Sequence, residues 1–263
     1  MRVAVIIPFI NFIGRTAIYV CNSLGRFSLF LAQAIRVLVT TKLKVSKCLY
    51  QMNRIGVESL NITILTGSFT GMVFALQSYI GFQRVGGEQF IGVVVALGMI
   101  RELGPVLTGL MVTGRAGSAI AAEIGTMLIT EQIDALRTLR INTFQYLVVP
   151  RMIAGTVMLP CLAAFAMLCG IIGGYLICVY VLELSPEEYV NSIKNFVELA
   201  DIRGGLIKSA AFGLILSWVG TYKGFYTSGG ARGVGIATTQ SVVMSSIFIL
   251  ISNYFLTKML ERL

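Results

Sequence analysis

The chain has 263 residues, of which 56% are hydrophobic and 13% are charged, and its formal net charge is +9. Soluble domains carry roughly 25% charged residues, and a soluble chain of this length would lack the polar side chains to cover its surface. We therefore predict an all-α integral membrane protein rather than a soluble fold.

Residues 1–57 form a basic arm that contains eight Lys or Arg residues and no acidic residue. Within residues 1–37, apolar groups alternate with arginines at positions 15, 26 and 36. Such arginines reach the lipid headgroups while the apolar side chains enter the membrane. We favour an amphipathic interfacial helix here over the alternative, a full span. The basic and apolar start is interpreted as retained, not as a cleaved signal peptide.

Several apolar stretches beyond the arm reach the length that a bilayer-crossing helix requires. The third of these stretches is either one tilted helix or a helix with a break near Gly170–Gly174. No linker, low-complexity tract or clear repeat divides the chain, so we predict one domain over residues 1–263, with the bundle in 58–263. The five predicted transmembrane helices cover residues 58–80, 90–114, 146–182, 205–222 and 237–257.

The distribution of charge predicts the orientation of the chain. Basic flanks stay in the cytoplasm, which places the N-terminal arm inside. Residues 183–203 contain five acidic residues against Lys194 and Arg203, and the number of spans places this loop outside. Residues 115–145 and 223–240 then lie inside, and the C-terminus lies outside. Topology and attraction to anionic lipid account for the positive charge without nucleic acid.

Small residues mark two surfaces on which helices are expected to pack closely. The first span is unusually polar, and its Gly67 and Gly71 form a GxxxG pair, which permits close approach of another helix. A row of small residues that includes Gly114 and Gly117 ends the second span. We predict that both rows lie against protein, and that the first span faces protein or a cavity.

The second span carries Arg101 and Glu102 at its middle, which predicts a depth near the bilayer centre, where charge is costly. Pro105 has no backbone N–H, so the carbonyl of Arg101 loses its usual helical donor. We expect a kinked or broken helix whose polar groups face a cavity or another helix. A purely structural ion-pair network is the alternative, and both roles can coexist.

The stretch TEQIDALRTLR at residues 130–140 is a short polar segment between two apolar ones. Thr130 is expected to cap a helix, and Asp134 is expected to pair with Arg137 three residues later. A rigid helix held just outside the bilayer can dock into a groove of a cytoplasmic partner. The alternative is a solvated connector helix.

The chain lacks the motifs that would let it hydrolyse nucleotide alone. A P-loop requires a Lys directly after its glycines, and GGARGVG at residues 229–235 has none. We interpret that stretch as a mobile cytoplasmic turn. The sequence contains no histidine, no nucleophile–base pair and no metal-ligand spacing. We therefore expect no catalytic residue, no metal and no cofactor, with any energy supplied by another protein.

Two other classes of protein are alternatives. A secondary transporter working alone would have inverted repeats and charges in several spans, whereas only one predicted span carries a buried charge pair. An intramembrane enzyme acting on lipid needs acids, a serine–base pair or metal ligands at a shared depth, and no such cluster is found in the sequence.

Four motifs together resemble the MlaE/YrbE-type permeases of ABC lipid transporters, and the resemblance extends over nearly the whole chain. The block at 101–151 is highly specific. The motifs are FALQSYIGF at 74–82, RELGPVLTGLMVTGRAGSAIAAEIGTMLITEQIDALRTL at 101–139, YLVVPR at 146–151 and GVGIATTQSVV at 233–243.

The resemblance implies a homodimeric permease with five transmembrane helices and an N-terminal interfacial helix. It implies two cytoplasmic ABC ATPase subunits, which carry the ATP and Mg, and an MCE-domain lipid-binding protein on the outer side. The implied cargo is phospholipid, moved to maintain outer-membrane asymmetry or to import lipid. The implied location is the bacterial inner membrane, with the plastid inner envelope as the alternative.

The resemblance also implies roles for individual residues. Residues near the lipid cavity are expected to be Arg101, Glu102, Gln77 and Tyr79. The coupling region for the ATPase is expected at about 123–139. Its expected contact residues are Glu123, Glu131, Gln132, Asp134 and Arg137. The sequence departs from some relatives at IDALRTLRINTFQ, which affects the exact partner contacts rather than the role.

Overall fold

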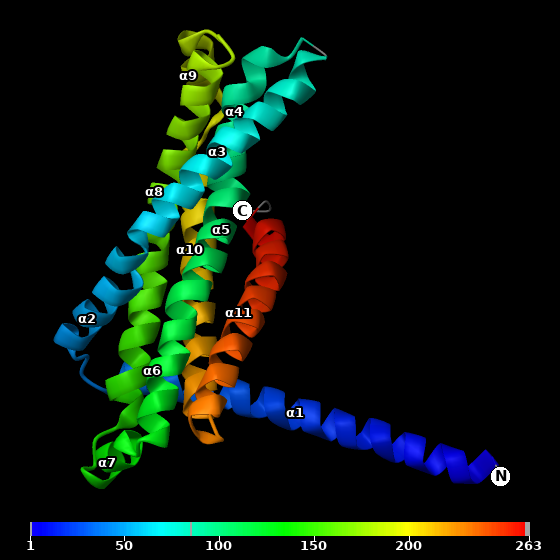
Figure 1. The fold of residues 1–263 in the computed structure, drawn as a ribbon, viewed down its shortest axis with the longest axis vertical. Helices are drawn as coiled ribbons and strands as arrows, with labels where there is room; N and C mark the ends of the chain where they lie inside the picture. Colours follow the sequence, from blue (N-terminus) through cyan, green and yellow to red (C-terminus); the bar gives the residue numbers. More distant parts are fainter. Residues whose placement is uncertain (1, 85, 261–263) are drawn as a thin grey trace.

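The computed structural model describes residues 2–84 and 86–260, and most side chains before residue 21 lie outside this description. Within these residues every regular element is a helix, in agreement with the predicted class. Figure 1 shows an elongated bundle with α1 (Arg2–Thr40) lying across its lower end. The short α7 (Gln132–Thr138) lies at the same end, and α9 (Pro186–Phe196) lies at the opposite end.

Four of the remaining elements are long helices, α3 (Leu60–Gln83), α8 (Val149–Tyr180), α10 (Leu199–Phe225) and α11 (Gly230–Leu260), and the others are shorter helical segments. Three of these segments are single π-helical turns within longer helices. The shorter segments are α2 (Val45–Ile55), η1 (Val57–Ser59), η2 (Glu88–Phe90), α4 (Ile91–Gly98), η3 (Met99–Leu103), α5 (Gly104–Val112), η4 (Thr113–Gly117), α6 (Ser118–Ile129) and η5 (Phe144–Val148).

Six helical stretches of the described residues are long and apolar enough to cross a membrane. Five of them correspond to the predicted spans, and the sixth lies within α1. Unlike the other five stretches, α1 runs across the bundle rather than along it (Figure 1). The stretches are Cys21–Thr40, Val45–Gln83, Glu88–Ile129, Phe144–Tyr180, Leu199–Phe225 and Gly230–Leu260.

Several predicted boundaries were wrong. The helix expected to end near residue 114 continues to Ile129, because its alanine-rich continuation favours helix. The stretch predicted as a loop at 183–203 contains α9 and the start of α10. The stretch at 229–235 is not a mobile turn, because α11 begins at Gly230. The third stretch has no break, since α8 runs through its glycines as one helix.

Close backbone contact between α3 and α8 explains why those glycines do not interrupt the helix. A Cβ atom on Gly67 would approach within 2.7 Å of the Ala166 carbonyl oxygen, and one on Gly71 would overlap the backbone of Gly170. Gly117 presents its carbonyl oxygen 3.1 Å from the position of a Cβ on Gly220 in α10. Gly114 does not take the predicted packing role, because nothing lies within 4 Å of that position.

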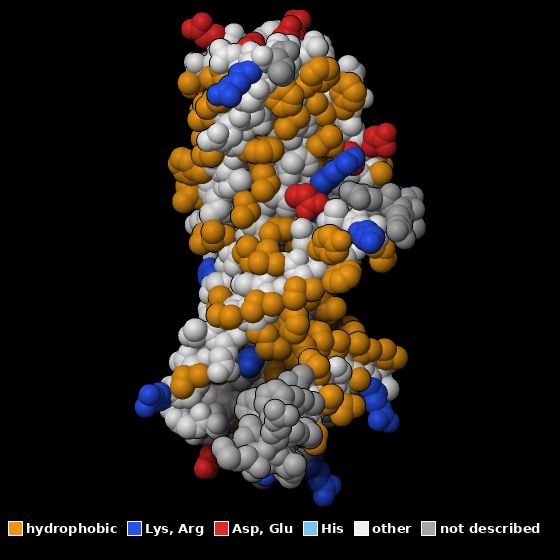
Figure 2. All heavy atoms as spheres, turned by 90° about the vertical axis from the view of Figure 1, so that its right-hand side faces the viewer, with side chains coloured by type: hydrophobic (Ala, Val, Ile, Leu, Met, Phe, Trp, Pro, Cys, Tyr) orange, Lys and Arg blue, Asp and Glu red, His pale blue; other side chains and the backbone are white. Residues whose placement is uncertain are grey.

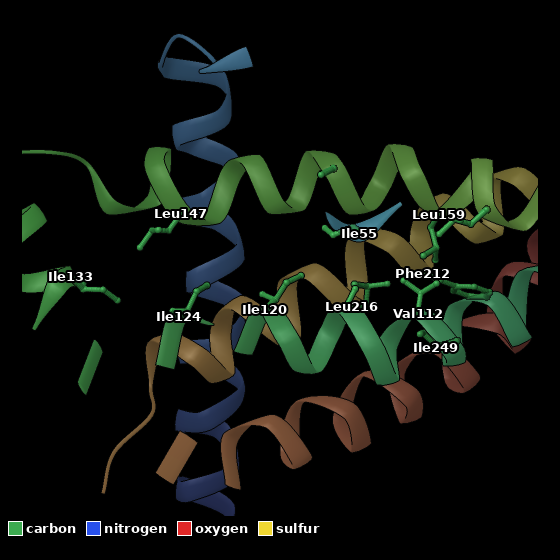
Figure 3. Close-up of a cluster of buried hydrophobic side chains, with 13 residues drawn as sticks. Ile55, Val112, Ile120, Ile124, Ile133, Leu147, Leu159, Phe212, Leu216 and Ile249 are labelled. Atoms are coloured by element: carbon green, nitrogen blue, oxygen red, sulfur yellow. The ribbon is translucent and has the colours of Figure 1, made fainter. Parts of the chain in front are cut away.

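The main hydrophobic core lies between α6, α8, α10 and α11, and includes Phe212, Leu216 and Leu159. Figure 3 shows these side chains pointing into the space between the helices. Ile133 of α7 belongs to the same cluster and is fully buried. The short helix is therefore fixed to the end of the bundle by apolar burial.

Candidate functional site

Glu102 accepts side-chain hydrogen bonds from two helices, α10 and α11. Its Oε1 accepts from Lys208 Nζ of α10 at 2.7 Å and from Thr257 Oγ1 of α11 at 3.0 Å. Its Oε2 accepts from Asn253 Nδ2 at 2.9 Å. The Lys208 side chain is 4% exposed, whereas that of Glu102 is 40% exposed. The carboxylate is thus fixed in place while part of its surface stays accessible.

Lys208 also accounts for the backbone defect at Pro105. Pro105 has no N–H to donate to the Arg101 carbonyl. This carbonyl instead accepts a hydrogen bond from Lys208 Nζ at 2.9 Å. The backbone remains helical through the π turn η3, so the expected break did not occur. A buried ammonium with three acceptors, including Thr257 Oγ1 at 2.7 Å, meets its hydrogen-bonding need.

Arg101 points to a different partner from its neighbour. Its Nε donates to Asp201 Oδ1 at 2.7 Å, and its Nη2 lies 2.6 Å from the same oxygen. Asp201 is buried, and its Oδ2 accepts from the Glu198 N–H in the capping box that begins α10. The Arg101 side chain remains 54% exposed, so its guanidinium can also contact a ligand.

These residues surround a pocket of about 290 Å³. It lies at the start of α10 and the end of α11. Arg101 lies 13 residues after Glu88 and 28 before Ile129 in a helical stretch of 42 residues. The pair is therefore nearer one end of this helix than predicted, because the prediction used a span that ended too early.

The two residues predicted on α3 do not join this pocket. Gln77 is exposed, and Tyr79 packs against a separate apolar cluster that includes Ile91 and Val95. Neither lines the pocket around Arg101 and Glu102. The structure therefore brings together the charged pair but leaves the α3 residues apart from it.

The segment around α7 differs from its prediction at the helix start. The residue before the helix is Glu131, with φ of 59° in the left-handed region. Thr130 does not cap α7, because its hydroxyl donates to the Thr126 carbonyl of the preceding helix. The predicted pair is confirmed, since Arg137 Nη1 donates to Asp134 Oδ1 at 2.9 Å.

The outer surface of α7 is available for contact. Ile133 is buried, whereas Glu131, Gln132 and Asp134 are exposed. Leu139, just after the helix, is 70% exposed. A rigid helix with one buried anchor and an exposed mixed surface suits docking of a partner protein.

A second charged group lies beside α7 and includes Glu123. Its Oε2 lies 2.9 Å from Arg151 Nη2, and its Oε1 lies 3.8 Å from Arg54 Nη1. The three residues and Gln132 line a pocket of about 740 Å³. Glu123 therefore connects α2, α6 and α8 at the end of the bundle that carries α7.

Sequence reasoning missed several members of both groups. Lys208 and Arg151 are buried within the fourth and third apolar stretches, so the inference that only one span holds buried charge was wrong. An isolated Lys inside an apolar run was a readable signal. Asn253 and Thr257 gave no comparable signal, because polar residues are frequent near helix ends. Among the described residues, no cluster of three His, Cys, Asp or Glu could hold a metal ion.

Residues 48–259 match the model of a protein family described as Permease MlaE. The chain belongs to the MlaE permease family. The residues of this match include the Glu102 network and the whole of α7. The whole of α1 lies outside the matched residues.

Curated relatives align with this MlaE-family chain over most of its length. A probable ABC transporter permease protein of Rickettsia bellii is 47% identical over 95% of this chain and 96% of its own. The intermembrane phospholipid transport system permease protein MlaE of Haemophilus influenzae is 34% identical over 96% of this chain and 97% of its own. The Arabidopsis thaliana protein TRIGALACTOSYLDIACYLGLYCEROL 1, chloroplastic, is 39% identical over 86% of this chain and 64% of its own.

Proposed function

We propose that this chain is the permease subunit of an ABC transporter that moves phospholipid between membranes. The observation that carries the proposal is the near-full-length similarity to the Haemophilus phospholipid permease. The rickettsial relative, named as an ABC transporter permease, supports the same class. We infer that ATP is hydrolysed by a separate subunit.

Two copies of the chain would form the permease, with the membrane crossed five times by each. α1 would lie at the cytoplasmic surface, in keeping with its direction across the bundle (Figure 1). The bacterial inner membrane is the proposed location. Acidic residues at the α9 end and basic residues at the α1 end support this orientation (Figure 2).

The exposed surface of α7 would dock into the ATPase subunit. Its acidic residues Glu131 and Asp134 are candidate contacts, with Gln132, Arg137 and Glu123 beside them. The opposite end of the bundle, where α9 lies, would face an MCE-domain partner. These assignments are consistent with α7 and α9 lying at opposite ends of the molecule (Figure 1).

Lipid would be held near the Glu102 network. The Arg101 guanidinium can attract a phosphate while Asp201 holds it in position, because a charge-assisted contact to phosphate is strong. Apolar walls would receive the acyl chains. Gln77 and Tyr79 on α3 do not line this pocket within one copy of the chain. They would border the lipid cavity only if a second copy of the chain or the bound lipid completed its wall.

The geometry also suggests how ATP hydrolysis on a separate subunit could move lipid. The stretch Glu88–Ile129 is one helix of 42 residues, about 60 Å long at 1.5 Å per residue. Its inner end lies next to α7, and Arg101 and Glu102 lie toward its outer end. Movement of α7 by an ATPase would therefore be transmitted along a single helix to the lipid pocket.

Purification of the native complex tests the proposal. We expect an ABC ATPase subunit and phospholipid to be identified by mass spectrometry with the chain. Vesicles containing the complex should transfer labelled phospholipid only with ATP. If the chain alone transferred lipid at the same rate, it would be a secondary transporter and the proposal would be wrong.

A further inference from the structure

A polar pocket of about 630 Å³ lies where α1, α10 and α11 meet, at the end of the bundle that carries α7. Two cations, Arg26 and Lys223, line it, and no acidic residue is among its described lining residues. Hydroxyl groups are also present in the lining. The hydroxyl-bearing residues are Ser23, Tyr222, Tyr226, Thr227 and Ser228.

An apolar trough of about 360 Å³ continues from this pocket along α11. The two cavities share Lys223, Gln240 and Met244, and Lys223 Nζ donates to Gln240 Oε1 at 3.1 Å at their junction. Beyond the junction the trough is lined by apolar side chains. Of these, Val243 is 54% exposed and Ile247 is 50% exposed.

The two cavities together have the chemistry of one phospholipid. Arg and Lys with hydroxyl groups bind a phosphate headgroup, and an adjacent apolar trough accepts an acyl chain. Figure 2 views the molecule from the α11 side and shows a continuous band of hydrophobic side chains above the lower end. A lipid with its headgroup at the inner surface would match this order of polar and apolar surfaces.

We propose that this combined cavity binds an inner-leaflet phospholipid, with its phosphate between Arg26 and Lys223 and one acyl chain along α11. This headgroup–trough site is separate from the Glu102 pocket, which lies toward the opposite ends of α10 and α11. The inference deepens the proposed function, because it names where lipid can be held before transport. Binding of lipid at this site can be measured without lipid transport.

The chain carries its own reporter for this site. Its single tryptophan, Trp218, stacks on Phe27 with ring centroids 3.9 Å apart. Phe27 lines the polar pocket and also stacks on Phe248 of the trough at 5.6 Å. A bromine atom on an acyl chain in the trough would therefore quench the fluorescence of Trp218.

The test titrates the purified full-length chain in detergent with phosphatidylglycerol carrying brominated acyl chains, without ATPase or ATP. We expect saturable quenching. In the Arg26→Gln, Lys223→Gln double variant, the half-saturating lipid concentration should rise roughly thirtyfold, about fivefold for each lost charge. Ile247→Ser should also weaken binding, because it reduces the apolar surface of the trough.

A matched control removes two cations elsewhere. Arg84→Gln with Lys194→Gln makes the same change in net charge at exposed positions of the opposite end. We expect this variant to bind the brominated lipid as the parent does. If the control variant bound the brominated lipid as weakly as the Arg26→Gln, Lys223→Gln variant, only net charge would matter for binding. The proposed headgroup–trough site would then be wrong. Thermal melting of each variant identifies those that fail to fold, and for these Ile247→Ser provides the independent test.

Two further arms separate the possible occupants. Glycerol phosphate should not displace the brominated lipid at matched concentration, and equal displacement would mean that the trough contributes nothing, against the proposal. Spontaneous cross-linking of Val243→Cys between two copies in the membrane, above the background of the parent's own cysteines, would assign the trough to a second copy and overturn it. If brominated lipid quenched Trp218 as expected but the native complex failed to transfer lipid with ATP, only the proposed function would be contradicted.

Discussion

At the scale of single residues, Lys208 is central, because it serves a carboxylate and a backbone carbonyl together. Its ammonium contacts Glu102 and the Arg101 carbonyl that Pro105 leaves without a donor. Removing only this side chain would leave the Arg101 carbonyl without a donor and the Glu102 carboxylate without its cation, although Thr257 and Asn253 still donate to that carboxylate. Removing the carboxylate as well would eliminate the larger part of that penalty.

We predict that Lys208→Met lowers the free energy of unfolding by up to about 3 kcal/mol. This is the lower end of the range for breaking a buried pair, because Glu102 is 40% exposed and solvent screens it. The double variant Lys208→Met, Glu102→Gln should recover much of the loss. Thermal melting in detergent measures both, and Lys194→Met is the exposed control. Strictly additive losses would refute the coupling.

The sequence predicted part of this network and could not predict the rest. Pro105 and the unpaired Arg101 carbonyl were readable, because they follow from covalent geometry. The helix did not break, because Lys208 from α10 supplied the missing donor. That contact joins residues 107 positions apart, and local sequence carries no record of such a pairing.

At the scale of helices, the contact between α3 and α8 depends on missing side chains. Gly71 lies against the backbone of Gly170, and Gly67 lies against Ala166. Helices that touch in this way gain dispersion contacts along their backbones. Any added atom must separate them.

Gly71→Ala should therefore destabilise the protein by about 1–3 kcal/mol, the usual range for overpacking a well-packed core. Gly81→Ala is the matched control on the same helix, because nothing lies within 4 Å of a Cβ at Gly81. Melting temperatures of the two variants and the parent provide the measurement. Similar behaviour of Gly71→Ala and Gly81→Ala would mean that the close contact does not exist.

The exposed acidic residues of α7 allow a test of coupling. Glu131→Lys with Asp134→Lys should abolish ATP-dependent lipid transfer by the complex, or reduce it at least tenfold, because it reverses the charge of the docking surface. Ile133 stays buried, so the chain should still insert and fold. The same reversal at Glu187 and Glu188 on α9 controls for net charge when the amount of co-purified ATPase subunit is measured, because the α9 end would not face the ATPase. Transfer at the parental rate would exclude α7 as the coupling contact.

At the scale of the whole molecule, charge predicts which end faces which compartment. A cysteine-free variant with Thr138→Cys should react with a membrane-impermeant thiol reagent only when the cytoplasmic side is accessible. Glu187→Cys should react only from the other side. Labelling of both positions from one side would contradict the proposed topology.

The arrangement of whole helices was predicted more accurately than their ends. Apolar runs reveal spans directly, because a bilayer demands them. The ends at Ile129 and Gly230 were missed, since helices can continue beyond the apolar region when nothing stops them. The π turns at Met99–Leu103 and Thr113–Gly117 had no signal in the sequence, and they depend on packing between helices.

The backbone contact along Gly67 and Gly71 also limits which parts of the molecule can deform. Where the two helices touch through main-chain atoms, no side chain lies between them to rearrange, so we expect α3 and α8 to move together. Within the described residues, no glycine of α11 makes such a backbone contact with another helix, and only 22% of the most apolar part of α11 is buried, against 44% for the stretch that contains α8. A force applied to the protein would therefore displace α11 from the bundle more readily than it would separate α3 from α8.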